Sequence, residues 1–229
     1  MYKKNIGLII TIDGPAGAGK STVAKELAHK LDFVYINTGD LYRYITYYAL
    51  YKRLDVNNAQ AMNKLSKEIV RKYTQEYSYL DLISHIKLIK AKIHSPEINK
   101  KVSFVARHSL VREKLIPLQR MFAQDGSVVM EGRDIGTVII PYADLKFYLT
   151  ADEQTRTMRR YKELHEKGYQ ITFQDVKKEI TCRDYIDSKR KTAPLTRPED
   201  AILIDTTNKN VNEVVEEMLR IIKNDRIKQ

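Results

Sequence analysis

Two hydrophobic patterns alternate along the chain, and each predicts a different element. Short apolar runs without alternation are typical of strands buried on both faces and occur at 6–12, 33–36, 127–130, 145–149 and 201–204. Helical periodicity predicts helices at 20–31, 41–52, 57–73, 111–124 and 211–222, and two charged helices are predicted at 152–167 and 172–189. This alternation predicts a doubly wound α/β fold: a five-stranded parallel sheet with helices on both faces and ligands at the carboxyl ends of its strands.

One segment, 79–93, fits two patterns. Its apolar positions Leu82 and Ile86 suit a helix, whereas alternation from Ile86 to Leu88 and beyond suits a hairpin strand. The periodicity alone leaves both alternatives open. Directly after this segment, Ser95 followed by proline is a helix-start signal.

The composition is that of a soluble globular protein. Hydrophobic residues make up 43% and charged residues 30% of the 229 residues, which excludes a disordered chain. The longest apolar run is too short to span a bilayer, and no secretory leader opens the sequence. The single cysteine, Cys182, cannot form an internal disulfide, as fits a reducing compartment. We therefore expect a cytoplasmic protein without a membrane partner.

The charge balance suggests an anionic partner. The chain has 40 Lys and Arg against 29 Asp and Glu, a formal net charge of +11. This excess suits nucleic acid, an anionic membrane surface or small phosphorylated ligands, and lysines on solvated helix faces are the alternative. Glycines are more specific, because six of the nine lie within 13–21, 37–43 and 131–136. Such clustering is typical of backbone that approaches a ligand closely.

The most specific motif follows the first predicted strand and precedes a predicted helix, the context that a G-x4-G-K-[ST] phosphate loop requires. It consists of Gly14, Pro15, Ala16, Gly17, Ala18, Gly19, Lys20 and Ser21, followed by Thr22. Its glycines let backbone N–H groups curl around a phosphate at the helix N-terminus. We expect Lys20 to bridge the β- and γ-phosphates of ATP, and the Ser21 hydroxyl to bind Mg²⁺.

Other classes of nucleotide-binding protein fit less well. A GTPase needs an Asn-Lys-x-Asp motif, and the segment 208–211 lacks the final aspartate. A motor or helicase has an apolar run that ends in an acid, but the Gly-Arg-Asp that follows Glu131 does not suit that class. Arginines near the strand ends favour transfer to a second phosphorylated molecule, because a guanidinium binds phosphate through two parallel hydrogen bonds.

Two groups of candidate acceptor-binding residues follow strands. Arg43 lies one turn into the helix after Thr38, and Arg133 with Asp134 follows the third strand. The alternatives are a surface arginine on a capped helix for Arg43 and a buried Arg–Asp pair that closes a loop for the second group.

A third group lies on one face of the helix at 172–189 and just beyond it. Arg183, Asp187 and Arg190 recur at i, i+4 and i+7. From spacing alone, an exposed ladder of ion pairs is an equal alternative to a ligand-binding face.

In this order, the motifs resemble those of bacterial cytidylate kinases, which are P-loop nucleoside monophosphate kinases. The matching segments are 12–22, 37–43, 131–137 and 183–195. The resemblance implies a P-loop NTPase-type three-layer fold with a core at about 1–55, 109–150 and 191–229, a small acceptor-binding insert at about 56–108 and a helical lid at about 151–190. It also implies transfer of the γ-phosphoryl group of ATP to CMP or dCMP by a monomer that uses Mg²⁺.

The resemblance assigns roles at the acceptor. In the family, the positions of Arg43 and Arg133 hold the acceptor phosphate, and those of Arg183 and Asp187 bind the sugar hydroxyls. The cytosine is contacted at the positions of Thr38, Ser103, Arg112, Asp134 and Arg190. Taken alone, Ser103 and Arg112 would be interpreted as residues on the surface of a helix.

The resemblance also implies which residues act on the transferring phosphoryl group. Lys20 and Arg133 are expected to neutralise its charge together with Arg159 and Arg160 of the lid, and Arg156 is a further candidate. A closing lid would also exclude water that would otherwise hydrolyse ATP.

The sequence departs from the family pattern at two positions and in one segment. Asn37 stands where aspartate is common, His94 replaces an arginine, and 79–93 lacks the glycine of the family's inserted hairpin. A kinase for another small acceptor, such as UMP, AMP or shikimate, is the nearest alternative. A basic nucleic-acid-binding protein that uses ATP is the other, but no nucleic-acid-binding motif supports it, so we expect no nucleic-acid partner.

Overall fold

The computed structural model describes residues 7–124 and 126–228. Its five strands form one sheet in the order β2-β3-β1-β4-β5, and the ladders of β1 with β3, β1 with β4 and β4 with β5 are parallel. The strands are β1 (Ile9–Asp13), β2 (Val34–Asn37), β3 (Val128–Glu131), β4 (Leu145–Thr150) and β5 (Ile202–Asp205). The predicted parallel sheet is confirmed, with strand bounds shifted by a few residues. Ile6, where the first strand was predicted to begin, lies outside the described residues.

Two compact units divide the chain. The first takes its described residues from Met1–Ile36, Asp125–Tyr185 and Leu195–Gln229, and the second from Asn37–Gln124 and Ile186–Pro194. This division separates the sheet and the phosphate loop from a helical unit. The functional division into core, insert and lid stays a prediction.

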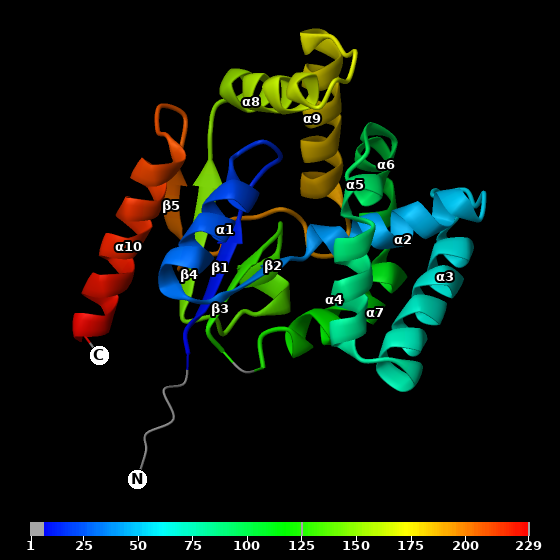
Figure 1. The fold of residues 1–229 in the computed structure, drawn as a ribbon, viewed down its shortest axis with the longest axis horizontal. Helices are drawn as coiled ribbons and strands as arrows, with labels where there is room; N and C mark the ends of the chain where they lie inside the picture. The colour runs from blue at the N-terminus through cyan, green and yellow to red at the C-terminus, as the bar shows by residue number, and fades with distance from the viewer. Residues whose placement is uncertain (1–6, 125, 229) are drawn as a thin grey trace. The chain divides into compact units, whose positions relative to one another are not determined.

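In the first unit, two helices pack together against the sheet (Figure 1). They are α1 (Lys20–Leu31) and α10 (Val211–Lys228). Val23 and Leu27 of α1 and Met218 of α10 form one apolar cluster with Ile10 and Phe147 of the central strands. Continuous burial of these strand residues is the reason that their sequence shows uninterrupted apolar runs.

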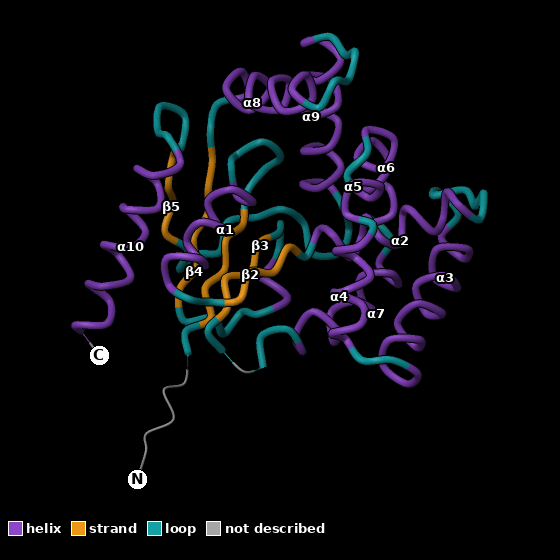
Figure 2. The backbone as a smooth tube through the Cα atoms, viewed as in Figure 1, coloured by secondary structure: helices purple, strands orange, loops and turns teal. Residues whose placement is uncertain are grey.

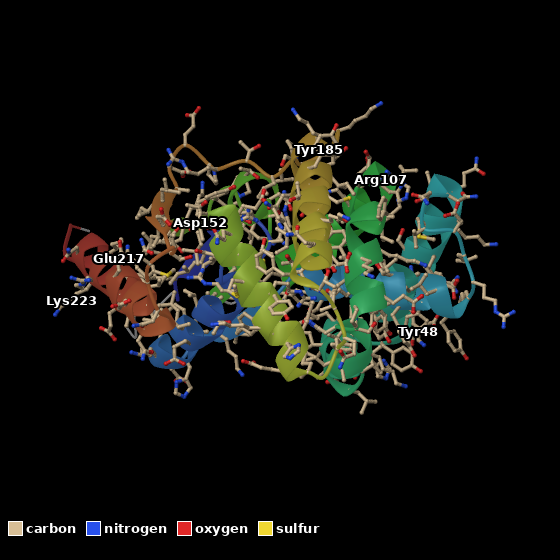
Figure 3. All side chains as sticks on the ribbon, turned by 90° about the horizontal axis from the view of Figure 1, so that it is seen from above. Tyr48, Arg107, Asp152, Tyr185, Glu217 and Lys223 are labelled. Carbon is tan, nitrogen blue, oxygen red and sulfur yellow. The ribbon has the colours of Figure 1, made fainter. Side chains whose placement is uncertain are left out.

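Two further helices follow β4: α8 (Glu153–Glu166) belongs to the first unit, and α9 (Phe173–Lys189) belongs to it up to Tyr185. Asp152 caps α8 by accepting a hydrogen bond from the Thr155 N–H at 2.7 Å, and Figure 3 labels it at the start of that helix. Leu164, Val176 and Ile180 pack the two helices together. Within the described part of the chain, none of the helices is long and apolar enough to cross a membrane.

In the second unit, residues 39–124 form only helices, turns and loops (Figure 2). The helices are α2 (Gly39–Tyr51), α3 (Ala59–Arg71), the π-helix η1 (Lys72–Glu76), α4 (Tyr79–Leu88), α5 (Lys90–Ile93), α6 (Pro96–Ala106) and α7 (Ser109–Met121). The segment 79–93, which the sequence left open, is therefore helical. Ser78 and Asp81 form a capping box that starts α4, while Leu82 and Ile86 are buried on its inner face.

Candidate active site

The phosphate loop joins β1 to α1, and glycine is required at two of its positions. Gly14 has φ +145°, and a Cβ there would come within 2.0 Å of the Leu149 carbonyl oxygen. Gly17 has φ +77°, and its Cβ would come within 2.8 Å of the Arg156 carbonyl oxygen. A side chain is therefore excluded at both positions. Because both residues are glycines, the loop backbone can pass close to β4 at Gly14 and to α8 at Gly17.

Lys20, the first residue of α1, is buried and donates a hydrogen bond from Nζ to the Pro15 carbonyl oxygen at 2.6 Å. Burial lowers the pKa of Lys20 well below its usual range, and the positive charge of Arg133 lowers it further. Glu131 opposes this effect. Lys20 is therefore held inside the loop at a position that disfavours its positive charge. An anionic ligand bound there would favour the protonated form.

Ser21 and Thr22 are exposed residues in the first turn of α1. A serine hydroxyl at this position suits Mg²⁺, which prefers oxygen ligands and usually takes most of them from substrate phosphates and water. In the described ranges, no group of three or more His, Cys, Asp or Glu side chains forms a ready-made metal site. The Ser21 hydroxyl thus fits a Mg²⁺ ion that takes its other ligands from the nucleotide phosphates and water.

A second loop follows β3 at the same edge of the sheet and is held by Asp13. The two carboxylate oxygens of Asp13 accept the N–H groups of Ile135 at 2.9 Å and Gly136 at 2.8 Å. These bonds fix the backbone directly after Arg133 and Asp134. Burial raises the pKa of Asp13 to about 6, although the two N–H groups act in the opposite direction. Asp134 is buried and Arg133 half-buried.

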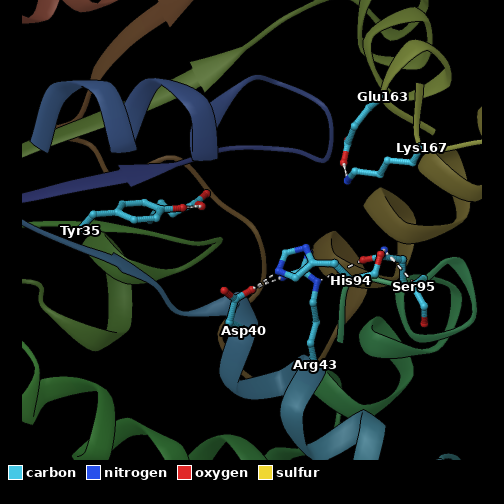
Figure 4. Close-up of polar contacts among 9 residues, drawn as sticks. Tyr35, Asp40, Arg43, His94, Ser95, Glu163 and Lys167 are labelled. Atoms are coloured by element: carbon cyan, nitrogen blue, oxygen red, sulfur yellow. Dashed lines mark hydrogen bonds and ion pairs between the residues drawn. The ribbon is translucent and has the colours of Figure 1, made fainter. Parts of the chain in front are cut away.

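Glu131, the last residue of β3, is buried and accepts a hydrogen bond from the Tyr35 hydroxyl at 2.8 Å (Figure 4). Its negative charge favours the protonated form of Lys20. The carboxyl ends of β1 and β3 therefore bring Asp13, Lys20, Glu131 and the Arg133 loop together, as their parallel pairing requires.

The three arginines of α8 make different contacts. Arg156 Nη1 donates to the Ala16 carbonyl oxygen at 2.9 Å and forms an ion pair with Asp184. Arg159 donates to Thr206 Oγ1 at 2.9 Å and lies close to Gly19. Arg160 pairs with Glu163 on its own helix at 2.8 Å. Arg156 therefore contacts the phosphate loop and Arg159 lies beside it, whereas the ion pair of Arg160 stays within α8.

In the second unit, Arg43 belongs to a polar cluster at the start of α2 (Figure 4). Its Nε donates to Asn99 Oδ1 at 3.1 Å, and its Nη1 lies 3.2 Å from Asp40 Oδ1. His94 Nε2 donates to the same carboxylate oxygen at 2.8 Å. Burial acts to raise the pKa of Asp40, but the hydrogen bond from His94 and the charge of Arg43 outweigh it and lower that pKa. Thr38 is the N-cap residue of α2, two positions before Asp40 in the sequence, and it is buried.

Ser103 on α6 and Arg112 on α7 are buried. The position on a helix surface that each residue taken alone suggests is therefore wrong. Arg112 is only 1% exposed; its guanidinium lies 5.2 Å from the ring centroid of Tyr42 and donates to the Ala106 carbonyl oxygen at 3.3 Å. A cation over an aromatic face keeps its charge at lower desolvation cost.

Asp187 and Arg190 are almost fully buried in the second unit, so an exposed ladder of ion pairs is excluded for them. Arg190 Nη1 lies 3.7 Å from Asp187 Oδ1, and its Nε donates to the Ala193 carbonyl oxygen at 2.5 Å. Arg183, one turn earlier on α9, is half-buried in the first unit.

A family model of cytidylate kinase matches residues 10–224. The chain belongs to the cytidylate kinase family. It is 46% identical over 214 residues to the cytidylate kinase of Alkaliphilus oremlandii, with 93% of this chain and 97% of that protein covered. Identity to the cytidylate kinase of Alkaliphilus metalliredigens is 45% over 212 residues, with coverage of 93% and 94%.

The fold is also similar to a crystal structure of an uncharacterized protein from Eubacterium ventriosum. The TM-score is 0.54 at 13% sequence identity, and the match covers 95% of this chain and 98% of the other. At this identity the likeness concerns the fold alone. It agrees with the α/β architecture expected for the cytidylate kinase family.

Sequence reasoning missed two carboxylates of this family member. Asp13 was available as a signal, since it ends an otherwise apolar strand directly before the phosphate loop. Asp184 gave no comparable signal. Its oxygen accepts the Ala16 N–H at 2.9 Å, a contact across 168 positions that depends on how α9 packs.

Proposed function

We propose that this protein transfers the γ-phosphoryl group of ATP to CMP and dCMP, forming ADP with CDP or dCDP. The observation that carries the proposal is the phosphate loop with its buried Lys20, in a chain of the cytidylate kinase family. Arg133 at the same sheet edge supports it, because its charge already acts on Lys20.

The chemistry needs little beyond positioning and charge neutralisation. A phosphate oxygen of the acceptor is largely ionised near neutral pH, so no strong general base is required. We propose that Lys20 and Arg133 stabilise the charge on the transferring group, with Arg159 and Arg160 of the lid contributing when it closes. Binding of the polyphosphate raises the pKa of Lys20 again, since an opposite charge favours its protonated form.

ATP is the donor, and we propose that the phosphate loop, residues 14–22, holds its phosphates. Ser21 is the residue that would hold Mg²⁺ through its hydroxyl. When bound, the metal supplies positive charge to the β- and γ-phosphates. The exposed position of Ser21 at the start of α1 supports this role.

For the acceptor, we propose that Arg43 and Arg133 bind the phosphate and that Arg183 and Asp187 bind the sugar. Contacts to cytosine are proposed for Thr38, Ser103, Arg112, Asp134 and Arg190. The guanidinium groups of Arg43 and Arg133 suit a phosphate, which they can bind through two parallel hydrogen bonds. A carboxylate at Asp134 suits the exocyclic amine of cytosine, which is a hydrogen-bond donor.

We also propose the functional division into a core, an acceptor-binding insert at about 56–108 and a lid at about 151–190. The helical pair α8 and α9, with Arg156 already on the phosphate loop, supports the lid. Action as a cytoplasmic monomer, without a nucleic-acid partner, stays a prediction.

The test is ADP release, followed with a coupled spectrophotometric assay, from ATP and Mg²⁺ with CMP, dCMP, UMP, AMP, GMP or shikimate as acceptor. Strong turnover with CMP and dCMP over the other acceptors is expected. Preference for another acceptor would refute the cytosine contacts while leaving the kinase chemistry. A folded protein without acceptor-dependent turnover would refute the proposal.

A further inference from the structure

Residues of α8 and α9 bind both backbone polar groups of Ala16, in the middle of the phosphate loop. The Ala16 N–H donates to Asp184 Oδ1 at 2.9 Å. The Ala16 carbonyl oxygen accepts from Arg156 Nη1 at 2.9 Å. Arg156 Nη1 also pairs with Asp184 Oδ2, so the three residues form a closed ring of hydrogen bonds. We name this ring of Ala16, Arg156 and Asp184 the clamp.

Each member of the clamp is held by further contacts. Arg156 Nε donates to the Ala151 carbonyl oxygen at 3.1 Å, which fixes the guanidinium at the start of α8. The missing side chain of Gly17 lets the Arg156 backbone approach the loop, since a Cβ there would lie 3.0 Å from the Arg156 Cβ. The side chains of Arg156 and Asp184 are only 11% and 19% exposed, so water screens their pairing weakly.

We propose that Asp184 is a positioning residue for phosphoryl transfer that acts by holding Arg156 against the phosphate loop. The guanidinium is then already beside the loop when ATP binds, so its entropy of ordering is not lost during the reaction. The clamp also ties closure of α8 and α9 to the conformation of the loop that binds the donor. This inference rests on the proposed function, because it concerns the transfer step of that reaction.

An asparagine at position 184 separates the two contacts. Its Oδ1 can still accept the Ala16 N–H, but its amide group replaces the carboxylate oxygen that pairs with Arg156. If Asp184 acts only by accepting the Ala16 N–H, the Asp184→Asn enzyme should have a nearly normal kcat. A role through Arg156 predicts that Asp184→Asn behaves like Arg156→Ala.

The experiment measures kcat and KM for ATP and CMP in Asp184→Asn, Arg156→Ala and the double variant. A loss of about 10- to 100-fold in kcat, with little change in KM for CMP, is expected for both single variants. The double variant should be no slower than Arg156→Ala, because the two residues act as one unit. The matched control is Asp175→Asn, which removes an exposed carboxylate from the same helix. Wild-type kcat in Asp184→Asn, or losses that multiply in the double variant, would overturn the proposal.

A second readout does not depend on the acceptor. Hydrogen–deuterium exchange of ATP-free protein should become faster in peptides of α8 for Asp184→Asn and stay unchanged for Asp175→Asn. Unchanged exchange in Asp184→Asn overturns the clamp, even if wild-type enzyme turns over an acceptor other than CMP. Should Asp184→Asn fail to fold, Arg156→Lys keeps the charge without the guanidinium fork, and wild-type kcat in that variant overturns the proposal.

Discussion

Replacing Asp13 by asparagine isolates the effect of a buried carboxylate on stability. Asp13 is only 1% exposed at the end of β1, and its oxygens accept the N–H groups of Ile135 and Gly136. Burial raises its pKa from 3.8 to about 6. The substitution leaves one of these two N–H groups without its acceptor at every pH, but it removes the titration, because an amide carries no charge at any accessible pH.

The magnitude and sign follow from the two pKa values. The folded protein keeps the proton of Asp13 up to about pH 6, whereas the unfolded chain loses it near pH 4. Between these values the folded state binds more protons, so stability falls as pH rises. The full effect is about 3 kcal/mol, since one pKa unit corresponds to about 1.4 kcal/mol. Below this pH window Asp13 is protonated in both the folded and the unfolded state. Above it, Asp13 is ionised in both states and the full contribution to stability has been lost.

The assay is urea unfolding of the wild type and Asp13→Asn at a series of pH values. Subtracting the free energy of unfolding of the variant from that of the wild type removes the titration of other carboxylates, provided that they do not interact with Asp13. Between about pH 4.5 and about pH 7.5 this difference should fall by about 2 kcal/mol. A constant difference, or one that rises with pH, would refute the assignment of a raised pKa to Asp13.

Three further predictions concern the site. Lys20→Ala and Arg133→Ala should each reduce turnover by about 100-fold or more with an unchanged melting temperature, and near-normal turnover in either would contradict its role. Gly14→Ala should destabilise the protein by about 3 kcal/mol or more, because its Cβ would lie 2.0 Å from the Leu149 carbonyl oxygen; an unchanged melting temperature would count against this geometry. His94→Ala removes a hydrogen-bond donor to Asp40, which also binds Arg43. Because Arg43 is then held less firmly, KM for CMP should rise about tenfold while KM for ATP is unaffected. Equal KM for CMP in the variant and the wild type would exclude this role.

The amino-acid sequence determined the features that depend on neighbouring residues. The five strands and the phosphate loop are predictable because their signals, an apolar run and glycines before Lys20, lie within about ten residues of one another. The helix start at Ser95 is predictable for the same reason, and its side chain caps α6 by accepting the Ile98 N–H at 3.4 Å. The cap satisfies a backbone N–H group locally, whereas the strands are recognised by their apolar runs although their hydrogen bonds join distant segments.

Only the tertiary structure decided the remaining features. The segment 79–93 fits a helix or a strand by its pattern, and packing of its apolar face in the helical unit selects the helix. Ser103 and Arg112 are buried in the helical unit, which neither residue taken alone reveals. The contacts of Asp13 and Asp184 join residues 122 and 168 positions apart. Such contacts depend on strand order and on helix packing, because a side chain finds a distant partner only after the chain has folded.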